Sequence, residues 1–301
     1  MLKTKNRKTI GVMGSNQIQH IIPLLEKEYK VINLQENWNR KATNISKLAR
    51  FLKEINDVDI VYNVFTSPYF WKKARIANYF GKKVVTHWIG TDARYTDEGK
   101  VDFTKLSYID IHLSCFQAIT DQLARHEIKT VIIPIVPFNL TFDLASMPKK
   151  HSVLIYMPKG VEQDYGYTVI CGIFALFPNL EFNIVANDDK SKFSAYPNVK
   201  VLGRLTLDEM EKLYNKISIV IRIHVNDGLS MSVLEALAKG KKVIWNYEFP
   251  FCLPGRTKNE IAMSLRKILT EDLKKDVEAH NFIAKEYSQE IVLNKYKKIF
   301  E

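Results

Sequence analysis

The chain has 301 residues, of which 46% are hydrophobic and 26% are charged, so it can bury one large core or two medium ones. Its net charge of +11 is compatible with anionic lipid surfaces, nucleic acids and phosphate-bearing substrates, and does not choose among them. No apolar run approaches the roughly 20 residues that span a bilayer, and residues 1–8 lead into a strand without the apolar segment of a signal peptide. We therefore expect a cytoplasmic protein, with peripheral attachment at the inner face of the membrane left open.

The cysteines are Cys115, Cys171 and Cys252, which lie far apart and outside any Cys-x-x-Cys spacing. An odd number of cysteines at such distances argues against a disulfide framework and against a structural zinc site. We expect buried thiols at these positions.

The N-terminal part alternates between strands and helices. Residues 9–16 predict a strand that ends in a small-residue turn, where Gly14 allows the backbone to approach a ligand closely. A helix follows at 18–25, then a strand at 30–34, a basic helix at 43–55 and a strand at 57–65. Asp57 and Asp59 have the spacing of a metal-binding pair, but they precede their strand, whereas open α/β sheets bind ligands at carboxyl strand ends. We therefore expect no metal site there.

Residues 66–83 combine five basic residues and five aromatic residues with no acidic residue. This mixture suits a helix on an anionic membrane, with rings at the interface and lysines toward the headgroups. The alternative is a surface helix whose aromatic residues pack into the core while its lysines are solvated. Both interpretations stay open.

A buried strand at 84–88 opens into a loop that contains His87, Gly90, Thr91 and Asp92, and further strands are predicted at 110–114 and 130–136. Pro137, Pro148 and the polar residues 149–151 mark an interdomain linker. Strands and helices alternate before and after it, which predicts parallel, doubly wound sheets in an α/β fold.

The second part continues this alternation, with strands at 152–156 and 180–186 and helices at 167–177 and 207–217. A β-branched strand then leads into Asp227-Gly228-Leu229-Ser230, and a helix with apolar residues at helical spacing runs to Gly240. The free amides and positive dipole end of such a helix start favour an anionic group, most often a phosphate. Ser232 and Glu235 also have the spacing of a capping box, in which Glu235 would contact no ligand.

This stretch resembles the C-terminal signature of retaining nucleotide-sugar glycosyltransferases with the GT-B fold, of the glycosyltransferase family 4 type. That signature places two acidic residues eight positions apart, the second in a Leu-Glu-Ala-(Met/Leu)-Ala-x-Gly context, and residues 227–240 keep this spacing, with Asp227 where the family usually has Glu. The loop after His87 resembles the His, Gly, Thr and Asp loop of many members of this class. The resemblance implies two Rossmann-like domains facing a cleft. They would be an acceptor domain at 1–147, to which a last helix at 288–301 crosses back, and a donor domain at 148–287.

The resemblance also implies roles for individual residues. Glu235 would hold the ribose of the donor, Asp227 its sugar, and Lys159 with Arg204 or Arg222 its diphosphate. The second diphosphate cation of the family falls at Tyr165, so it is missing here. His87, Asp227 and Glu235 are the candidate catalytic residues, and Asp92 would fix the acceptor-side loop. The remaining donor-binding candidates are Gly14, Ser15, Gly228, Leu229, Ser230 and Met231.

The function implied is transfer of a sugar from a nucleoside-diphosphate sugar, UDP- or GDP-linked, to a hydroxyl group of a glycan, lipid or protein. Retention of configuration is expected, without a metal or another cofactor. Two alternatives stay open: a nucleotide-sugar epimerase of the same fold, and a catalytically silent or nucleic-acid-binding module. The aromatic and basic residues of 66–83 could imitate a single-strand groove, but the resemblance disfavours nucleic acid as a partner.

Overall fold

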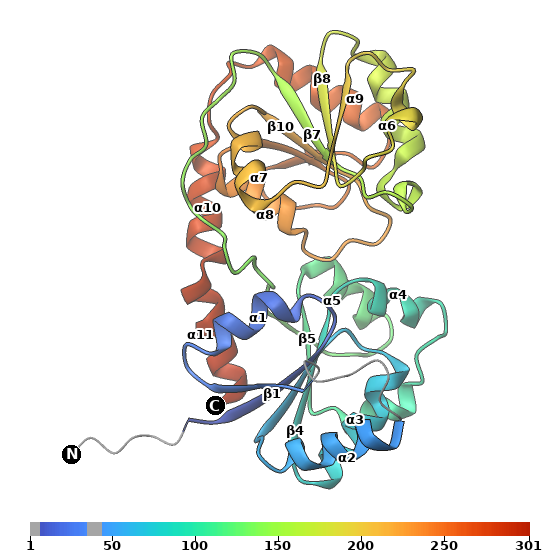
Figure 1. Cartoon of the computed structure of the whole chain (residues 1–301), viewed down its shortest axis with the longest axis vertical. Coiled ribbons are helices and arrows are strands. Elements are labelled where there is room, and N and C mark those ends of the chain that lie inside the picture. The colour runs from blue at the N-terminus through green and yellow to red at the C-terminus, as the bar shows by residue number, and fades with distance from the viewer. Residues whose placement is uncertain (1–6, 35–43) are drawn as a thin grey trace, which may run out of the picture. The chain divides into compact units, whose positions relative to one another are not determined.

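A computed structural model describes residues 7–34 and 44–301, without the side chains of 44–48 and 68–69. The predicted basic helix therefore begins at a residue outside the described ones. The chain divides into two compact units, one of which contains the residues up to Phe138 together with Gln289–Glu301, and the other Asn139–Ser288 (Figure 1). No helix in the described ranges is long and apolar enough to cross a bilayer.

The first unit is a parallel sheet in the order β2-β1-β3-β4-β5-β6. Its strands are β1 (Thr9–Gly14), β2 (Lys30–Asn33), β3 (Ile60–Val64), β4 (Lys83–Trp88), β5 (Ile111–Ser114) and β6 (Val131–Ile132). Its helices are α1 (Ile18–Leu25), α2 (Asn44–Ile55), α3 (Pro68–Tyr79), α4 (Thr91–Asp97), the 3-10 helix η1 (Phe103–Tyr108), α5 (Gln117–Ala124) and α11 (Gln289–Phe300).

The second unit is a parallel sheet in the order β12-β11-β10-β7-β8-β9. Its strands are β7 (Ser152–Tyr156), β8 (Glu181–Val185), β9 (Val199–Gly203), β10 (Ile219–Arg222), β11 (Lys242–Trp245) and β12 (Cys252–Pro254). Its helices are η2 (Glu162–Tyr165), α6 (Tyr167–Leu176), η3 (Lys190–Phe193), α7 (Leu207–Tyr214), α8 (Met231–Ala238), α9 (Lys258–Thr270) and α10 (Val277–Tyr287). The prediction of doubly wound parallel sheets is confirmed.

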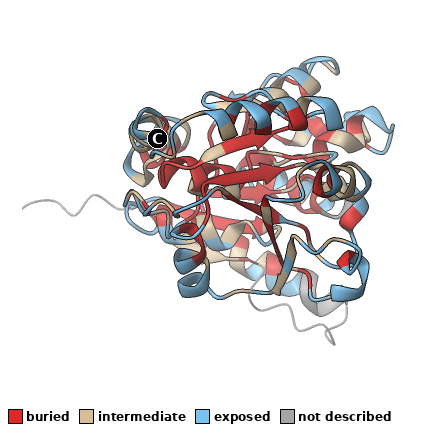
Figure 2. Ribbon diagram, turned by 90° about the horizontal axis from the view of Figure 1, so that it is seen from above, coloured by how far each residue is buried: buried red, intermediate tan, exposed pale blue. Residues whose placement is uncertain are grey.

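The central strands are the most buried elements of both sheets, as Figure 2 shows. Their β-branched runs are buried on both faces because helices cover both sides of a doubly wound sheet. In the first unit α11 supplies part of this cover. Tyr296 and Phe300 lie one helical turn apart on its buried face, and the Tyr296 hydroxyl is 2.9 Å from that of Tyr62 on β3. The C-terminal helix is thus part of the N-terminal core.

Two buried lysines of the second unit contact the segment after Phe138, where that unit begins. Lys239 Nζ contacts Thr141 Oγ1 at 3.3 Å, and the Lys239 carbonyl accepts a hydrogen bond from the Ala145 amide. Lys241 Nζ donates to the Ser146 carbonyl at 2.6 Å. Buried ammonium groups need such partners. The segment after Phe138 is therefore packed on the second unit rather than running free as a linker.

Gly14 closes β1 against the neighbouring strand β3. Its φ is +132°, and a Cβ atom there would lie 1.8 Å from the Val64 carbonyl oxygen. The next residue, Ser15, donates its amide to the same oxygen at 2.9 Å. Glycine is required here because the two backbones approach too closely for any side chain.

We predict that Gly14→Ala lowers the free energy of unfolding by about 3 kcal/mol or more, since the methyl group would have to displace the β3 backbone. Gly99→Ala is the matched control, because Gly99 also has a positive φ, +67°, but no heavy atom would lie within 4 Å of its Cβ. That variant should lose about 1 kcal/mol. Urea unfolding, monitored by circular dichroism, measures both free energies of unfolding. Equal losses of stability in the two variants would show that the close approach of β1 and β3 at Gly14 does not determine the effect.

Candidate functional site

The second sheet has its topological switch point between β7 and β10, which are neighbours although β8 and β9 lie between them in sequence. The chain leaves these two strands in opposite directions, so their carboxyl ends face loops that diverge. Open α/β sheets bind their ligands beside such a point. The residues that follow β7 and β10 are therefore the first place to look for a site.

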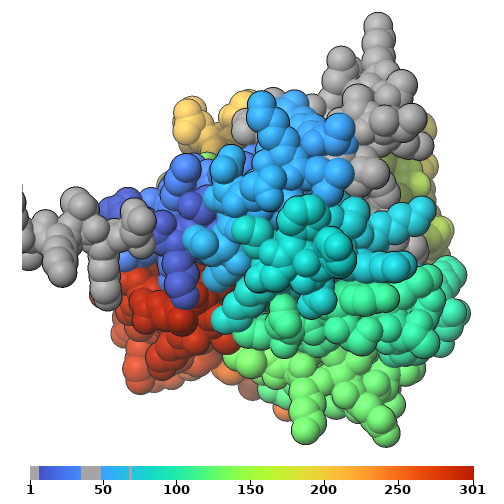
Figure 3. All heavy atoms as spheres, turned by 90° about the horizontal axis from the view of Figure 1, so that it is seen from below, coloured from blue at the N-terminus to red at the C-terminus, as the bar shows by residue number. Residues whose placement is uncertain are grey.

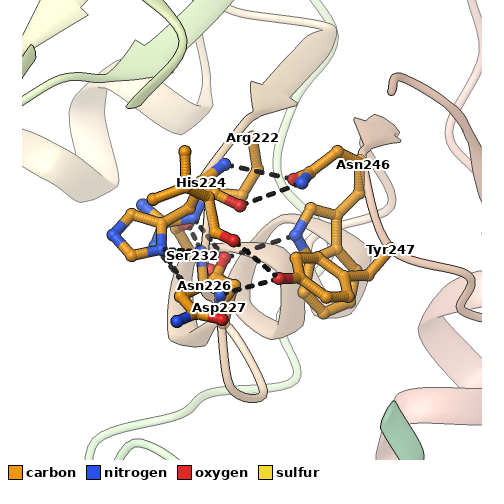
Figure 4. A network of polar contacts seen from close by, with 10 residues as sticks. Arg222, His224, Asn226, Asp227, Ser232, Asn246 and Tyr247 are labelled. Atoms are coloured by element: carbon orange, nitrogen blue, oxygen red, sulfur yellow. Dashed lines mark hydrogen bonds and ion pairs between the residues drawn. The ribbon is translucent and has the colours of Figure 1, made fainter. Parts of the chain in front are cut away.

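Arg222 ends β10 and forms a buried ion pair with Asp227 in the next loop (Figure 4). Its Nε donates to Asp227 Oδ2 at 2.7 Å and its Nη2 to Oδ1 at 2.8 Å, and both residues are 7% exposed. Trp245 Nε1, at the end of β11, is 3.3 Å from Asp227 Oδ2. The carboxylate predicted to contact a sugar thus accepts hydrogen bonds from within the protein.

Aromatic rings surround the guanidinium group. Arg222 Cζ lies 4.9 Å from the ring centroid of Tyr165 and 5.7 Å from that of Tyr156. The ring of His224 meets Tyr165 edge-on, with their centroids 4.6 Å apart. Burial raises the pKa of Tyr165, opposed by the charge of Arg222, and burial lowers the pKa of His224, opposed by Asp227. The phenol and the imidazole are therefore neutral near pH 7.

The loop from Ile223 to Asp227 is held by side chains that follow β11. Asn246 accepts from the His224 amide at 3.1 Å and donates to the His224 carbonyl at 2.9 Å. The Tyr247 hydroxyl accepts from the Asp227 amide and donates to the Val225 carbonyl. Neither residue was predicted as part of the site. The rule that ligands gather at carboxyl strand ends would have selected both, because they come directly after a buried strand.

Helix α8 begins immediately after this loop. Its N-cap residue is Ser230, in an extended conformation, and no side chain caps the amides of the first turn. The alternative capping box between Ser232 and Glu235 is absent, because Ser232 lies inside the helix and its hydroxyl contacts that of Ser230. Gly228 and Leu229 form the turn before the N-cap, and Met231 is the first helical residue. The helix start therefore offers backbone donors to a ligand.

Glu235 lies on the same helix, where its Oε2 accepts a hydrogen bond from the Tyr214 hydroxyl of α7 at 3.1 Å. Burial raises the pKa of Glu235, opposed by Tyr214 and by the charge of Lys239. No residue in the described ranges donates to its other oxygen, Oε1. One carboxylate oxygen can therefore accept from a ligand.

The two exposed cation candidates lie apart from this network. Lys159 Nζ forms an ion pair of 2.7 Å with Asp188, and that hydrogen bond raises the pKa of Lys159. Arg204 is exposed and follows β9, which is separated from β10 by β7 and β8 in the sheet. Of the predicted cations, Arg222 alone lies beside Asp227.

In the first unit, the predicted residues occupy the corresponding edge. The switch point is between β1 and β3, where Gly14 and Ser15 meet Val64, and the Ser15 hydroxyl accepts from the Gln17 amide. Asp92 is fully buried and accepts from the amides of Thr66, Ile89, Gly90 and Ala93. It therefore joins the loops that follow β3 and β4.

His87 lies in the core of the first unit and is 0% exposed. Its Nδ1 is 2.7 Å from the Tyr62 hydroxyl, which in turn contacts Tyr296. Burial lowers the pKa of His87 to about 3, opposed by backbone groups of Ser114 and Ile133. The imidazole is neutral and covered in this structure.

No metal-binding group of three or more His, Cys, Asp or Glu side chains occurs within residues 7–34 and 44–301. No protein-family model and no curated protein matches the chain.

Solved structures do match it. Sucrose-phosphate synthase from Thermosynechococcus elongatus is 12% identical, with 98% of each chain covered and a TM-score of 0.70. Anabaena HepE, in complex with UDP and glucose, is 12% identical, with 97% of this chain and 99% of that chain covered and a TM-score of 0.70. UDP-GlcNAc 2-epimerase from Methanocaldococcus jannaschii is 12% identical, covers 92% and 99% of the two chains, and has a TM-score of 0.54. The resemblance drawn from the sequence is thereby confirmed: over nearly its full length, the chain has the GT-B fold of nucleotide-sugar glycosyltransferases.

Proposed function

We propose that the protein transfers a sugar from a nucleoside-diphosphate sugar to a hydroxyl acceptor, with retention of configuration. The observation that carries this proposal is the start of α8, where uncapped amides, the Arg222 guanidinium and the Glu235 carboxylate come from one strand-loop-helix segment. These groups match the phosphate and ribose of a nucleotide in charge and in hydrogen-bonding type. The complex of Anabaena HepE with UDP and glucose supports a donor of this class.

Each group has a part in the proposed reaction. The bond between the sugar C1 and the diphosphate oxygen breaks, a bond between C1 and the acceptor oxygen forms, and the acceptor proton passes to the leaving diphosphate. The amides of the α8 first turn and Arg222 stabilise the charge that develops on the diphosphate. Glu235 Oε1 accepts from the ribose hydroxyls. We assign the donor to the second unit and the acceptor to the first, beside the Asp92 loop.

The epimerase alternative is favoured by one observation, the similarity of fold to UDP-GlcNAc 2-epimerase. The two activities differ in what they require. A transferase consumes its donor only when an acceptor is present, whereas an epimerase converts the donor alone.

We also propose an anionic membrane surface as a partner of α3. Tyr79 is 86% exposed and Phe80 is 42% exposed, and the basic Lys72 and Arg75 are exposed on the same helix. Figure 3 shows one face of the molecule, where the blue-to-cyan part of the chain that includes α2 and α3 reaches the surface. Phe70 and Trp71, by contrast, belong to the core. Among the described side chains of residues 70–80, these two rings and two cations are therefore available to a lipid headgroup layer.

A screen of UDP, GDP and their sugars by thermal shift, followed by a transfer assay with and without hydroxyl acceptors, tests the function. We predict that at least one of these nucleotides raises the melting temperature, because a ligand that binds the native state stabilises it. The corresponding sugar donor should be consumed only with an acceptor, and EDTA should leave the rate unchanged. Donor isomerised without an acceptor would favour the epimerase, and no binding at all would contradict both enzymes.

Glu235→Gln should weaken binding of the identified nucleoside diphosphate about 10-fold, or about 1.4 kcal/mol, because an amide accepts less strongly from ribose hydroxyls than a carboxylate does. Calorimetry measures the change. Glu278→Gln is the control, since it removes the same charge from an exposed residue of α10. Equal affinities for wild type and Glu235→Gln would rule out the ribose role.

For the membrane, the double variant Tyr79→Ser, Phe80→Ser should lose most of the binding to phosphatidylglycerol vesicles in co-sedimentation. Wild-type binding should fall as salt is raised and be absent on phosphatidylcholine vesicles, because surface charges are screened and neutral headgroups offer no attraction. Phe251→Ser removes an exposed ring from the second unit, 40% exposed, and should change nothing. Wild-type protein that stays in the supernatant with anionic vesicles would exclude this surface.

A further inference from the structure

The cation at the second switch point is neutralised by the protein itself. Arg222 places both Nε and Nη2 on Asp227, in the two-pronged geometry that a guanidinium also uses with a phosphate. Lys159, the other cation from the neighbouring strand, is paired with Asp188. Without a ligand, these side chains present balanced charges to an incoming anion.

The surroundings of Arg222 allow its partner to change without dismantling the loop. The rings of Tyr156, at the end of β7, and Tyr165, at the end of η2, lie against the guanidinium. On the other side, Asn246 and Tyr247 hold the backbone of residues 224–227, and neither of these contacts involves Arg222. Asp227 would also keep the Trp245 indole as a donor if Arg222 moved away.

We propose that Asp227 is an internal substitute for the diphosphate of the donor, and that the two anions exchange on Arg222. In the free protein Asp227 occupies the guanidinium. When a nucleoside diphosphate binds at the α8 start, a phosphate oxygen takes the place of Asp227, and the released carboxylate becomes available to a sugar hydroxyl. This inference rests on the proposed function, because it describes how the same site is regulated.

The exchange and a simple sugar contact predict different effects of removing the Asp227 carboxylate on the affinity for a diphosphate. If Asp227 only bound the sugar, its removal would leave binding of a diphosphate without sugar unchanged. If it competes with the diphosphate, its removal leaves Arg222 without an anion and makes that binding tighter. A sugar-free ligand therefore separates the two roles.

Calorimetry with UDP and with inorganic pyrophosphate tests the inference. Asp227→Asn should bind either ligand about 10-fold more tightly than wild type, and Arg222→Gln should bind either more weakly. Asp208→Asn is the matched control, because it makes the same charge change at an exposed residue of α7 and should alter neither affinity. Unchanged or weaker binding to a folded Asp227→Asn variant would overturn the exchange.

A second measurement covers the case in which Asp227→Asn does not fold. The Nε–H resonance of Arg222 in wild-type protein, assigned by its loss in Arg222→Gln, should shift on titration with pyrophosphate. A resonance that stays fixed at saturation would also overturn the proposal. The proposed function can fail separately. If wild type binds no nucleoside diphosphate or sugar donor, but Asp227→Asn binds pyrophosphate more tightly than wild type does, the anion exchange is supported and sugar transfer is contradicted.

Discussion

Each sheet of this protein depends on one buried aspartate at the edge where its loops meet. A buried carboxylate is costly unless donors surround it, so the loops that supply those donors are fixed by it. Asp92 does this in the first unit with four backbone amides. Asp227 does it in the second unit with the side chains of Arg222 and Trp245. The difference matters because a backbone amide cannot turn away, whereas a guanidinium on a flexible side chain can take another anion.

The two units therefore differ in the contacts that hold the loops at the edge of each sheet. The edge of the first unit is built from main-chain bonds and from core contacts such as those of Tyr62, His87 and Tyr296. The edge of the second unit is built from side chains that come from β10, from β11 and the residues directly after it, and from η2. A charged ligand that binds there competes with existing contacts, so affinity at this edge reflects a difference between two ion pairs rather than one new contact.

Much of the fold could be predicted from the sequence, because strands buried on both faces are apolar throughout and the helices between them have one apolar face. The strand predicted at 130–136 is shorter in the structure, where β6 contains only Val131–Ile132. Pro134 has no backbone N–H to donate to a neighbouring strand. Helix α4 was not predicted, since Gly90 and Thr91 are typical of loop residues. Asp92 accepts local hydrogen bonds from the Gly90 and Ala93 amides, but its bond from the Thr66 amide joins a distant residue. The contacts of Thr141, Ala145 and Ser146 with Lys239 and Lys241 could not be predicted either, because they join residues far apart in the sequence.

Around the candidate site, the sequence predicted a strand, a turn and a helix, and the structure has β10, the loop to Ser230 and α8 there. The partner of each side chain could not be predicted from the sequence. The pairing of Asp227 with Arg222 and of Glu235 with Tyr214 depends on packing that no local pattern encodes. His87 shows the same limit. A histidine at a strand end is compatible with a ligand contact, and its burial comes from Tyr62 and from Tyr296 of the last helix.

The chain leaves the first unit at Phe138 and re-enters it at Gln289, and the Gln289 side chain donates a hydrogen bond to the Phe138 carbonyl. The two cut ends of that unit are therefore already neighbours, with Lys27 holding the second of them through Gln289. Along the chain, residues 139–288 are thus inserted between two parts of the first unit. If residues 139–288 were replaced by a short connector, the first unit would become one uninterrupted stretch of chain that still contains α11.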